Sequence, residues 1–348
     1  MSRLLATHRS RRRAAVLPAV VGLAALLAAC GDPGSAGGGS PEPEETGGMT
    51  AAATCDPVPD KELVVLEDDQ KLQTVDNIIP AVNADLAESS PEVITLLDSV
   101  SAALDTDTLI GLNRAVDVER RTSKEVAQEF VETAGLEARD PSAGEGTSVA
   151  IGSADFAESA TLGTIYGKVL ESAGYDVTVT TIGNREAYLP ALVDGAQVQV
   201  VPEYVGTLTE FLNKQANGAD AEAVASSDLD ATVTELTTLG EDTGLAFGEP
   251  SPAQDQNAFA VTKAFAEEHG VTTLSELAEM CGGLMLGGPP ECTERPFCQP
   301  GLEDTYGLDF AEFRSLDAGG PLTKSALQNG EITLGLVFSS DGALSTSG

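Results

Sequence analysis

The sequence predicts an α/β fold with a largely parallel sheet. From residue 62 onward, short runs rich in β-branched residues alternate with stretches whose apolar residues recur every three or four positions. Such alternation is typical of a sheet whose strands are connected by crossover helices. The chain has 348 residues and is 42% hydrophobic, which is enough for two packed cores of ordinary size or one large core.

The expected elements follow one another along the chain in a regular order. Thr122 and Glu125 form a capping box at the start of one helix, and Gly135 provides its stop signal. Strands are predicted at residues 63–66, 148–152, 176–182, 198–202, 258–262, 284–287 and 332–338, and helices at residues 91–104, 124–134, 157–173, 186–194, 229–239 and 274–280.

The composition excludes several classes of function. The chain carries 55 Asp+Glu against 19 Lys+Arg, a formal net charge of −36, so it repels phosphate backbones and nucleic acid is not an expected partner. His269 is the only histidine outside the first 29 residues, so a Ser-His-Asp or Cys-His system would depend on that one ring. A multi-histidine zinc site is excluded. We expect no catalytic residue, metal or cofactor.

The N-terminus has the pattern of an export signal. Five arginines lie within the first 13 residues, and residues 14–29 form an apolar stretch too short for a confident membrane span. The stretch ends in Leu-Ala-Ala followed by Cys30, which resembles a bacterial lipobox. We therefore expect residues 1–29 to be a signal peptide, Cys30 to be lipidated, and residues 30–56 to form a flexible tether rich in Gly, Pro and Ser. The alternative is an ordinary secretory signal with a chance cysteine.

Four cysteines remain after Cys30, an even number that suits an oxidising compartment. Four cysteines allow three pairings. Cys292 and Cys298 bracket a short Pro-containing loop, which favours a bridge between them and leaves Cys55 to pair with Cys281. A metal site is the weaker interpretation, because the spacing lacks a paired C-x-x-C.

Three segments combine features of a ligand site. Each follows a predicted strand and contains an aromatic residue and small hydroxyl-bearing or glycine residues: GSADF at 152–156, PEYVGT at 202–207 and FSSDG at 338–342. Ligands of open α/β sheets bind beyond the carboxyl ends of the strands, where the connecting loops meet helix N-termini. We expect these three segments to form the site.

Read together, the motifs resemble the substrate-binding proteins of osmoprotectant ABC transporters, the glycine betaine/choline group of OpuAC/ProX type. The matching stretches include LVVLEDDQKLQ, GSADFAES, ALVDGAQVQVVPEYVGT, PGLEDTYGL and KSALQNGEITLGLVFSSDGAL, and they span about four fifths of the chain. The resemblance implies a two-lobed periplasmic-binding-protein-like fold of type II. It places one lobe at residues 77–255 and the other at residues 256–348 together with residues 61–76.

The order of the motifs departs from the family. There, the FSSDG-like strand is followed directly by the LVVLEDD-like strand and the final helices, whereas here LVVLEDD opens the folded region at Leu63. We interpret this as a circular permutation, with residues 137–147 as the new joining loop. The alternative is a truncated chain preceded by an unrelated helical domain. In a permuted chain a Cys55–Cys281 bridge would hold the strand at 63–66 in place.

The resemblance also implies ligand-binding residues. Tyr204 stands at a position of the family's aromatic cage, Thr207 at a carboxylate contact and Arg295 at an anion-binding arginine. The family's aromatic pair after the LVVLEDD strand falls here on Asp76 and Asn77, so Asp76 could balance a ligand cation by direct charge pairing. The remaining candidates are Phe259 and Phe338, which stand where the family usually carries Tyr, and Phe156 and Ser153 in the first junction.

These features predict an extracytoplasmic, lipid-anchored solute-binding protein that works as a monomer. It would capture a small quaternary amine or zwitterion of the glycine betaine, choline or carnitine type and deliver it to an ABC permease in the membrane. Quaternary ammonium has no hydrogen to donate, so aromatic faces are its natural partners. The alternatives are a lipid-anchored ligand sensor and, with less support, a hydrolase that uses paired acids in the same cleft.

Overall fold

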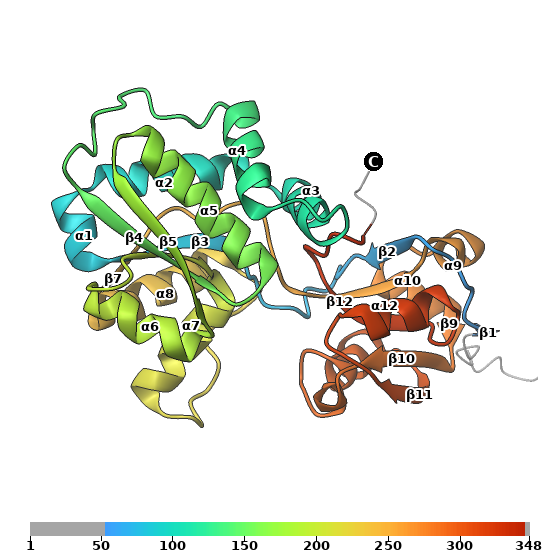
Figure 1. Ribbon diagram of the computed structural model, residues 1–348. Helices are drawn as coiled ribbons and strands as arrows, with labels where there is room; N and C mark the ends of the chain where they lie inside the picture. Colours follow the sequence, from blue (N-terminus) through green and yellow to red (C-terminus); the bar gives the residue numbers. More distant parts are fainter. Residues whose placement is uncertain (1–52, 345–348) are drawn as a thin grey trace, which may run out of the picture. The chain divides into compact units, whose positions relative to one another are not determined.

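The computed structural model describes residues 53–344, which form a mixed α/β fold with two five-stranded sheets (Figure 1). The predicted signal peptide, Cys30 and most of the predicted tether lie outside the described residues. Within residues 53–344, no helix combines the length and the apolar character that crossing a bilayer requires.

The first sheet, here called the β4 sheet, has the strand order β5-β4-β6-β3-β7. Strand β4 pairs in parallel with β5 and β6, whereas β3 pairs antiparallel with β6 and β7. The strands are β3 (Ile78–Asn83), β4 (Ser148–Ala154), β5 (Asp176–Gly183), β6 (Val200–Tyr204) and β7 (Leu245–Phe247).

Helices cover both faces of the β4 sheet, because its central strands are buried on both sides. Along β3, Ile78 and Val82 belong to the core beneath α2 and α5, and Ile79 and Ala81 belong to the core beneath α6, α7 and α8. The helices are α1 (Ala84–Ser89), α2 (Glu92–Ala103), α3 (Thr106–Asp117), α4 (Ser123–Ala134), α5 (Ala157–Ser172), α6 (Arg185–Asp194), α7 (Val205–Asn217) and α8 (Leu229–Thr243). The predicted capping box at Thr122 and Glu125 begins α4, and Gly135 ends it with a positive φ of 66°.

The second sheet, here called the β10 sheet, has the order β11-β10-β12-β8-β2. It repeats the pattern of the first: β10 pairs in parallel with β11 and β12, and β8 pairs antiparallel with β12 and β2. The strands are β2 (Leu63–Leu66), β8 (Asn257–Thr262), β10 (Leu284–Gly288), β11 (Phe310–Ser315) and β12 (Leu334–Phe338).

One face of the β10 sheet packs against α12, and the other packs against α9, α10 and η2. A short parallel pair, β1 and β9, lies outside the two main sheets. The remaining elements are β1 (Ala53–Thr54), α9 (Lys263–His269), α10 (Leu274–Met280), β9 (Cys281–Gly282), η1 (Pro290–Thr293), α11 (Gln299–Gly301), η2 (Leu302–Tyr306) and α12 (Pro321–Gln328).

The expectation of a largely parallel sheet is wrong, because each sheet has two parallel and two antiparallel strand pairs. The reversed strands are β3 and β8. Each enters its sheet from a segment that comes from the other sheet, not from a crossover helix. Residues 67–77 run from β2 to β3, and residues 248–256 run from β7 to β8.

These two crossing segments pair with each other. An antiparallel bridge joins Asn77 to Gln254, the Asp255 amide donates to the Asp76 carbonyl at 3.1 Å, and the Ile78 amide donates to the Ala253 carbonyl at 3.0 Å. The connection between the sheets is therefore a two-stranded ribbon.

Both predicted disulfides are confirmed. Cys55 bonds to Cys281 across 226 residues, and Cys292 bonds to Cys298 across six. The first bridge ties the segment before β2 to β9. The ring of His269 lies 3.6 Å from the Cys55 sulfur, but both thiols are consumed by the disulfide and supply no thiolate for a metal.

Replacing Cys55 and Cys281 together by Ser is expected to lower the free energy of unfolding by about 2–4 kcal/mol, because the bridge closes a long loop in the unfolded chain. Urea titration of the oxidised protein measures the change. The matched control is Cys292→Ser with Cys298→Ser, which opens a loop of only six residues and should cost less. A larger loss in the control than in the Cys55 variant would contradict the expected role.

Candidate functional site

Three adjoining cavities lie where the crossing segments meet the carboxyl ends of the strands. The Tyr204 cavity, of about 400 Å³, is lined among others by Asp76, Phe156, Arg185 and Tyr204. The Lys214 cavity, of about 390 Å³, shares Asp76, Arg185 and Thr207 with it. The Lys324 cavity, of about 670 Å³, shares Phe156. Asp255 and Phe338 line all three.

Asp76 is placed by the first crossing segment and holds the N-terminus of α7. Its Oδ1 accepts a hydrogen bond from the Thr207 amide at 3.0 Å. The approach is close because position 206 is glycine: a Cβ there would lie 2.1 Å from the Val75 carbonyl oxygen. Burial raises the pKa of Asp76 to about 7, although the α7 amide and the nearby Arg185 charge act in the opposite direction.

Asp255 is placed by the second crossing segment. Its Oδ1 accepts a hydrogen bond from the Ser340 hydroxyl at 2.9 Å. Burial and the neighbouring carboxylate of Glu158 raise the pKa of Asp255 well above its usual range. Asp255 thus adds a second carboxyl group to the same cavities as Asp76.

Glu158 is a third buried acid, and α5 places it in its first turn. Its Oε1 accepts a hydrogen bond from the Tyr204 hydroxyl at 2.6 Å, and its Oε2 accepts one from the Asn113 amide. Burial raises the pKa of Glu158. The ring centroids of Tyr204 and Phe156 lie 6.2 Å apart, and both rings line the Tyr204 cavity as adjacent walls.

The donors to these three acids are all neutral. Among the ion pairs of residues 53–344, none includes Asp76, Glu158 or Asp255. A buried carboxylate without a cationic partner is costly, which is why all three pKa values are raised. The site can therefore accommodate a positive charge.

Arg185, the basic residue that lines the Tyr204 cavity, is already engaged. Arg185 donates from Nε and Nη2 to the two carboxylate oxygens of the fully buried Glu203, at 3.0 and 2.6 Å. Tyr188 donates to the same carboxylate at 2.7 Å. Moving Arg185 to a ligand would leave Glu203 buried without its partner, and breaking a buried ion pair in this way is strongly unfavourable.

Three phenylalanines with large exposed fractions all face the cavities. Phe156 is 45% exposed and lines the Tyr204 and Lys324 cavities, and Phe338 is 37% exposed and lines all three. Phe297 is 37% exposed and lines the Lys214 cavity. Together with Tyr204, these rings offer aromatic faces to a ligand.

Five of the predicted site residues meet at these cavities: Asp76, Phe156, Tyr204, Thr207 and Phe338. They come from four separate parts of the chain, the segment that follows LVVLEDD and the three segments at strand ends. The first two of these three lead into helices α5 and α7, whereas no helix follows β12 within the described residues.

The other four predicted residues do not line the three cavities. Phe259 is buried in the core of the β10 sheet. Asn77 is buried and donates to the Ser251 carbonyl at 2.8 Å. Ser153 is fully buried, with its hydroxyl 3.0 Å from that of Thr181. Arg295 is exposed and lies 3.4 Å from Glu291, four residues earlier in the same loop.

Sequence reasoning did not select Glu158, Asp255, Arg185 or Phe297. Glu158 could have been selected from the sequence, because it is an acid in the first turn of a helix whose following turns are apolar. Phe297 lies in the cysteine loop that contains Arg295. Asp255 lies in an irregular segment, where no periodic pattern indicates which side chains face a cavity.

Comparison with known proteins identifies the family. The family described as the substrate-binding domain of ABC-type glycine betaine transport systems matches residues 49–133 and 147–347. The chain belongs to this family. The two matched segments leave out residues 134–146.

Two curated proteins are similar to this chain in sequence. A glycine-betaine-binding protein of Pseudomonas aeruginosa is 31% identical over 205 residues, which cover 56% of this chain and 62% of that protein. The glycine betaine-binding protein YehZ of Escherichia coli is 27% identical over 209 residues, which cover 58% of this chain and 67% of that protein. The chain thus spans about two thirds of the length of the curated relatives it matches.

Solved structures of binding proteins also align with the chain. The apo structure of YehZ from Escherichia coli has a TM-score of 0.46 and 24% identity, and covers 56% of this chain and 70% of YehZ. A glycine betaine/carnitine/choline ABC transporter structure has a TM-score of 0.41 and 20% identity, and covers 57% of this chain and 70% of that chain.

The raised pKa of Asp76 predicts the pH dependence of stability without ligand. Between about pH 4 and 7 the folded protein holds a proton on Asp76 that the unfolded chain has lost, so stability falls as the pH rises. Asp76→Asn keeps an oxygen acceptor for the α7 amide and removes the charge. It should make the decline shallower, by up to about 1.4 kcal/mol per pH unit.

Urea midpoints at pH 5, 6, 7 and 8 for both proteins measure this difference. Asp85→Asn is a suitable control, because Asp85 lies in the first turn of α1 and lines none of the three cavities. Parallel pH profiles for wild type and Asp76→Asn would contradict the prediction.

Proposed function

We propose that the protein is an extracytoplasmic solute-binding protein that captures a small quaternary amine or zwitterion of the glycine betaine, choline or carnitine type. It delivers this solute to an ABC permease and performs no chemistry on it. The observation that carries the proposal is the Tyr204 cavity, where aromatic faces and carboxyl groups without cationic partners surround one space of about 400 Å³. The family membership supports the same class of ligand.

The cation of the ligand binds among the rings and the acids. Phe156, Phe338 and Tyr204 offer aromatic faces, which attract a quaternary ammonium without requiring a hydrogen bond from it. Asp76 and Asp255 line the same cavity and provide the opposite charge when the bound cation displaces the protons that their raised pKa values retain. The net charge of −36 attracts cations over a longer range.

The carboxylate of a zwitterionic ligand has fewer partners. Arg185 is held by Glu203, and Arg295 lies outside the cavities. The exposed Lys214 lines the adjoining cavity and is the basic residue to which such a carboxylate extends. Choline, which has no carboxylate, does not need this contact.

The β4 sheet and the β10 sheet correspond to the two lobes of the binding protein. The first lobe contains residues 77–255, and the second contains residues 61–76 and 256–348. The ribbon formed by the crossing segments joins them and carries Asp76 and Asp255. A ligand that contacts both acids binds at the joint between the lobes, where it can stabilise a closed arrangement.

The protein acts outside the cytoplasm as a monomer anchored by lipid on Cys30. Its lipobox-like sequence supports the anchor, and its two disulfides suit an oxidising compartment.

The chain is a circular permutation of the family order. The family match breaks at residues 134–146, close to the predicted joining loop at 137–147. In the β4 sheet, the edge strand β7 follows β6 in the chain, but its counterpart in the β10 sheet, β2, precedes β12. A parallel bridge places Leu344 beside Leu63 at the start of β2. Each observation supports a family order in which β2 follows β12.

A thermal-shift panel tests the ligand class. The purified protein is heated with glycine betaine, choline, carnitine, amino acids or polyamines. A ligand at 100 times its dissociation constant stabilises the native state by roughly 2.7 kcal/mol, so a quaternary amine should raise the melting temperature visibly. The proposal would be contradicted if no quaternary amine raised the melting temperature while an amino acid or polyamine did.

The variant Asp255→Asn sharpens this test, because it removes a carboxyl group that lines all three cavities. It should weaken choline binding more than glycine betaine binding, since choline carries a net positive charge. Asp85→Asn is the matched control and should leave both affinities unchanged.

The permutation is tested by restoring the family order. The rearranged chain begins at Ser148, continues through Leu344, and is joined by a Gly/Ser linker of about ten residues to residues 55–136. It is expected to unfold cooperatively and to bind the same compounds as the original chain. Loss of folding would contradict the permutation, because residues 137–147 would then be needed for the fold and would not be only a joining loop.

A further inference from the structure

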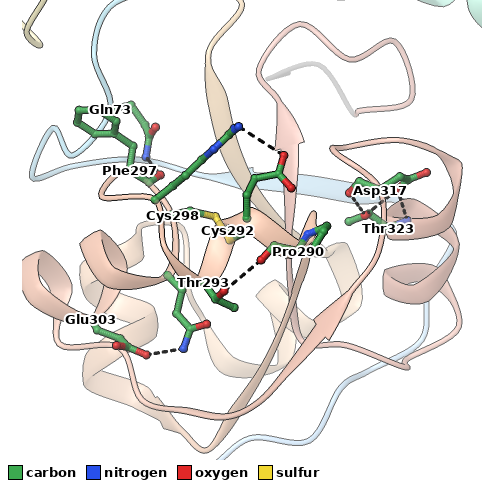
Figure 2. The surroundings of a disulfide bond; sticks show 12 residues. Gln73, Pro290, Cys292, Thr293, Phe297, Cys298, Glu303, Asp317 and Thr323 are labelled. Atoms are coloured by element: carbon green, nitrogen blue, oxygen red, sulfur yellow. Dashed lines mark hydrogen bonds and ion pairs between the residues drawn. A yellow bond between two sulfur atoms is a disulfide. The ribbon is translucent and has the colours of Figure 1, made fainter. Parts of the chain in front are cut away.

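The loop closed by Cys292 and Cys298 presents one aromatic ring to the ligand site. The two cysteines are buried, with Cα atoms 5.2 Å apart, whereas Phe297 between them is 37% exposed. Phe297 lines the Lys214 cavity together with Phe338, Asp255 and Asp76, which also line the Tyr204 cavity. Figure 2 shows Phe297 beside the disulfide and next to Gln73.

The backbone of this loop is attached to the first crossing segment. The side chain of the buried Gln73 donates from Nε2 to the Phe297 carbonyl at 3.0 Å (Figure 2). The backbone N–H of Gln73 donates to Oδ2 of Asp68 at 2.7 Å. The packing is tight, because a Cβ on Gly301 would lie 2.0 Å from the Pro296 carbonyl oxygen and 2.7 Å from Cδ1 of Leu72.

We propose that Phe297 is a ligand-binding residue of this protein, and that the Cys292–Cys298 disulfide and Gln73 act as positioning groups for its ring. The inference rests on the proposed function, because it adds a wall to the same site.

The Cys292–Cys298 disulfide contributes little to the stability of the fold as a whole. It closes a loop of only six residues, so it restricts the unfolded chain far less than the Cys55–Cys281 bridge. Its sulfur atoms lie in the core, and the loop between them contains the exposed ring. The bridge therefore acts locally, where a rigid loop lowers the entropy that is lost when the ring contacts a ligand.

Phe297 also adds a ring on the side of the site where the β10 sheet otherwise provides one. Phe156 and Tyr204 come from the junctions of the β4 sheet, and Phe338 ends β12 in the β10 sheet. Phe297 adds a second ring from the β10 side, at the Lys214 cavity. A cation held near Asp255 in the Lys214 cavity can then meet two aromatic faces from the β10 side, Phe297 and Phe338.

The test is isothermal titration of the full oxidised chain with choline and with glycine betaine. Phe297→Ala should weaken choline binding about five- to thirtyfold, the range expected for a desolvated cation–π contact. Phe297→Tyr keeps an aromatic face and should retain the affinity within a few fold. Leu322→Ala is the matched control, because Leu322 is an exposed apolar residue that lines none of the three cavities.

A double-mutant cycle separates positioning from general stability. Cys292→Ser with Cys298→Ser should weaken choline binding when Phe297 is present and should cause no further loss when position 297 is Ala. Gln73→Leu should behave in the same way. Equal losses on both backgrounds would overturn the positioning role.

The outcomes distinguish this inference from the proposed function. If wild type binds choline or glycine betaine and Phe297→Ala binds equally well, the inference is wrong and the proposed function stands. If wild type binds none of choline, glycine betaine and carnitine but binds an amino acid or polyamine, the proposed function fails and the inference fails with it. A loss in Leu322→Ala equal to that in Phe297→Ala would also overturn the inference.

Discussion

The antiparallel pairing of the two crossing segments is the constraint on which the rest of the structure depends. The bridge between Asn77 and Gln254 and the hydrogen bonds beside it set where β3 and β8 begin. Because side chains alternate along an extended chain, Asp76 and Asn77 face opposite sides of the ribbon. This explains why Asp76 lines the cavities whereas Asn77 is buried against the Ser251 carbonyl. One ribbon therefore sets both the joint between the sheets and the positions of two acids.

The fold could be predicted from the sequence wherever a local pattern matched its environment. The strand at 63–66 and the helix at 274–280 have the predicted bounds. Strand β3 was not predicted, because Pro80 lies in its middle and proline is unusual in a central strand. In the structure Pro80 lies opposite Pro202 of β6, and its carbonyl accepts a hydrogen bond from the Gly248 amide at 3.0 Å. The missing N–H of Pro80 therefore lies on the side of the segment that follows β7, an arrangement that depends on partners distant in the sequence and cannot be read from β3 alone.

The site could be predicted in part for a similar reason. The carboxyl ends of strands have a regular placement, so Tyr204, Thr207 and Phe338 could be found from their positions at or just after strand ends. Asp255 and Phe297 lie in segments whose conformation depends on a distant partner, the first on β3 and the second on Gln73. The cysteine loop was recognised, but which of its side chains faces the cavity depends on how the loop packs against residues 68–73. Arg295 and Phe297 are two positions apart in it and only Phe297 lines a cavity.

The Cys55–Cys281 bridge has a mechanical consequence. Strand β2 is at the edge of its sheet, where it pairs with β8 and is bridged to Leu344 at Leu63, so tension on the chain before β2 would break its hydrogen bonds one after another. The bridge lies eight residues before β2 and connects the chain to β9. A pull from the N-terminal side is therefore carried by a covalent bond to Cys281 in β9, three residues before β10 begins. The edge strand, and the ribbon that follows it, are shielded from that load.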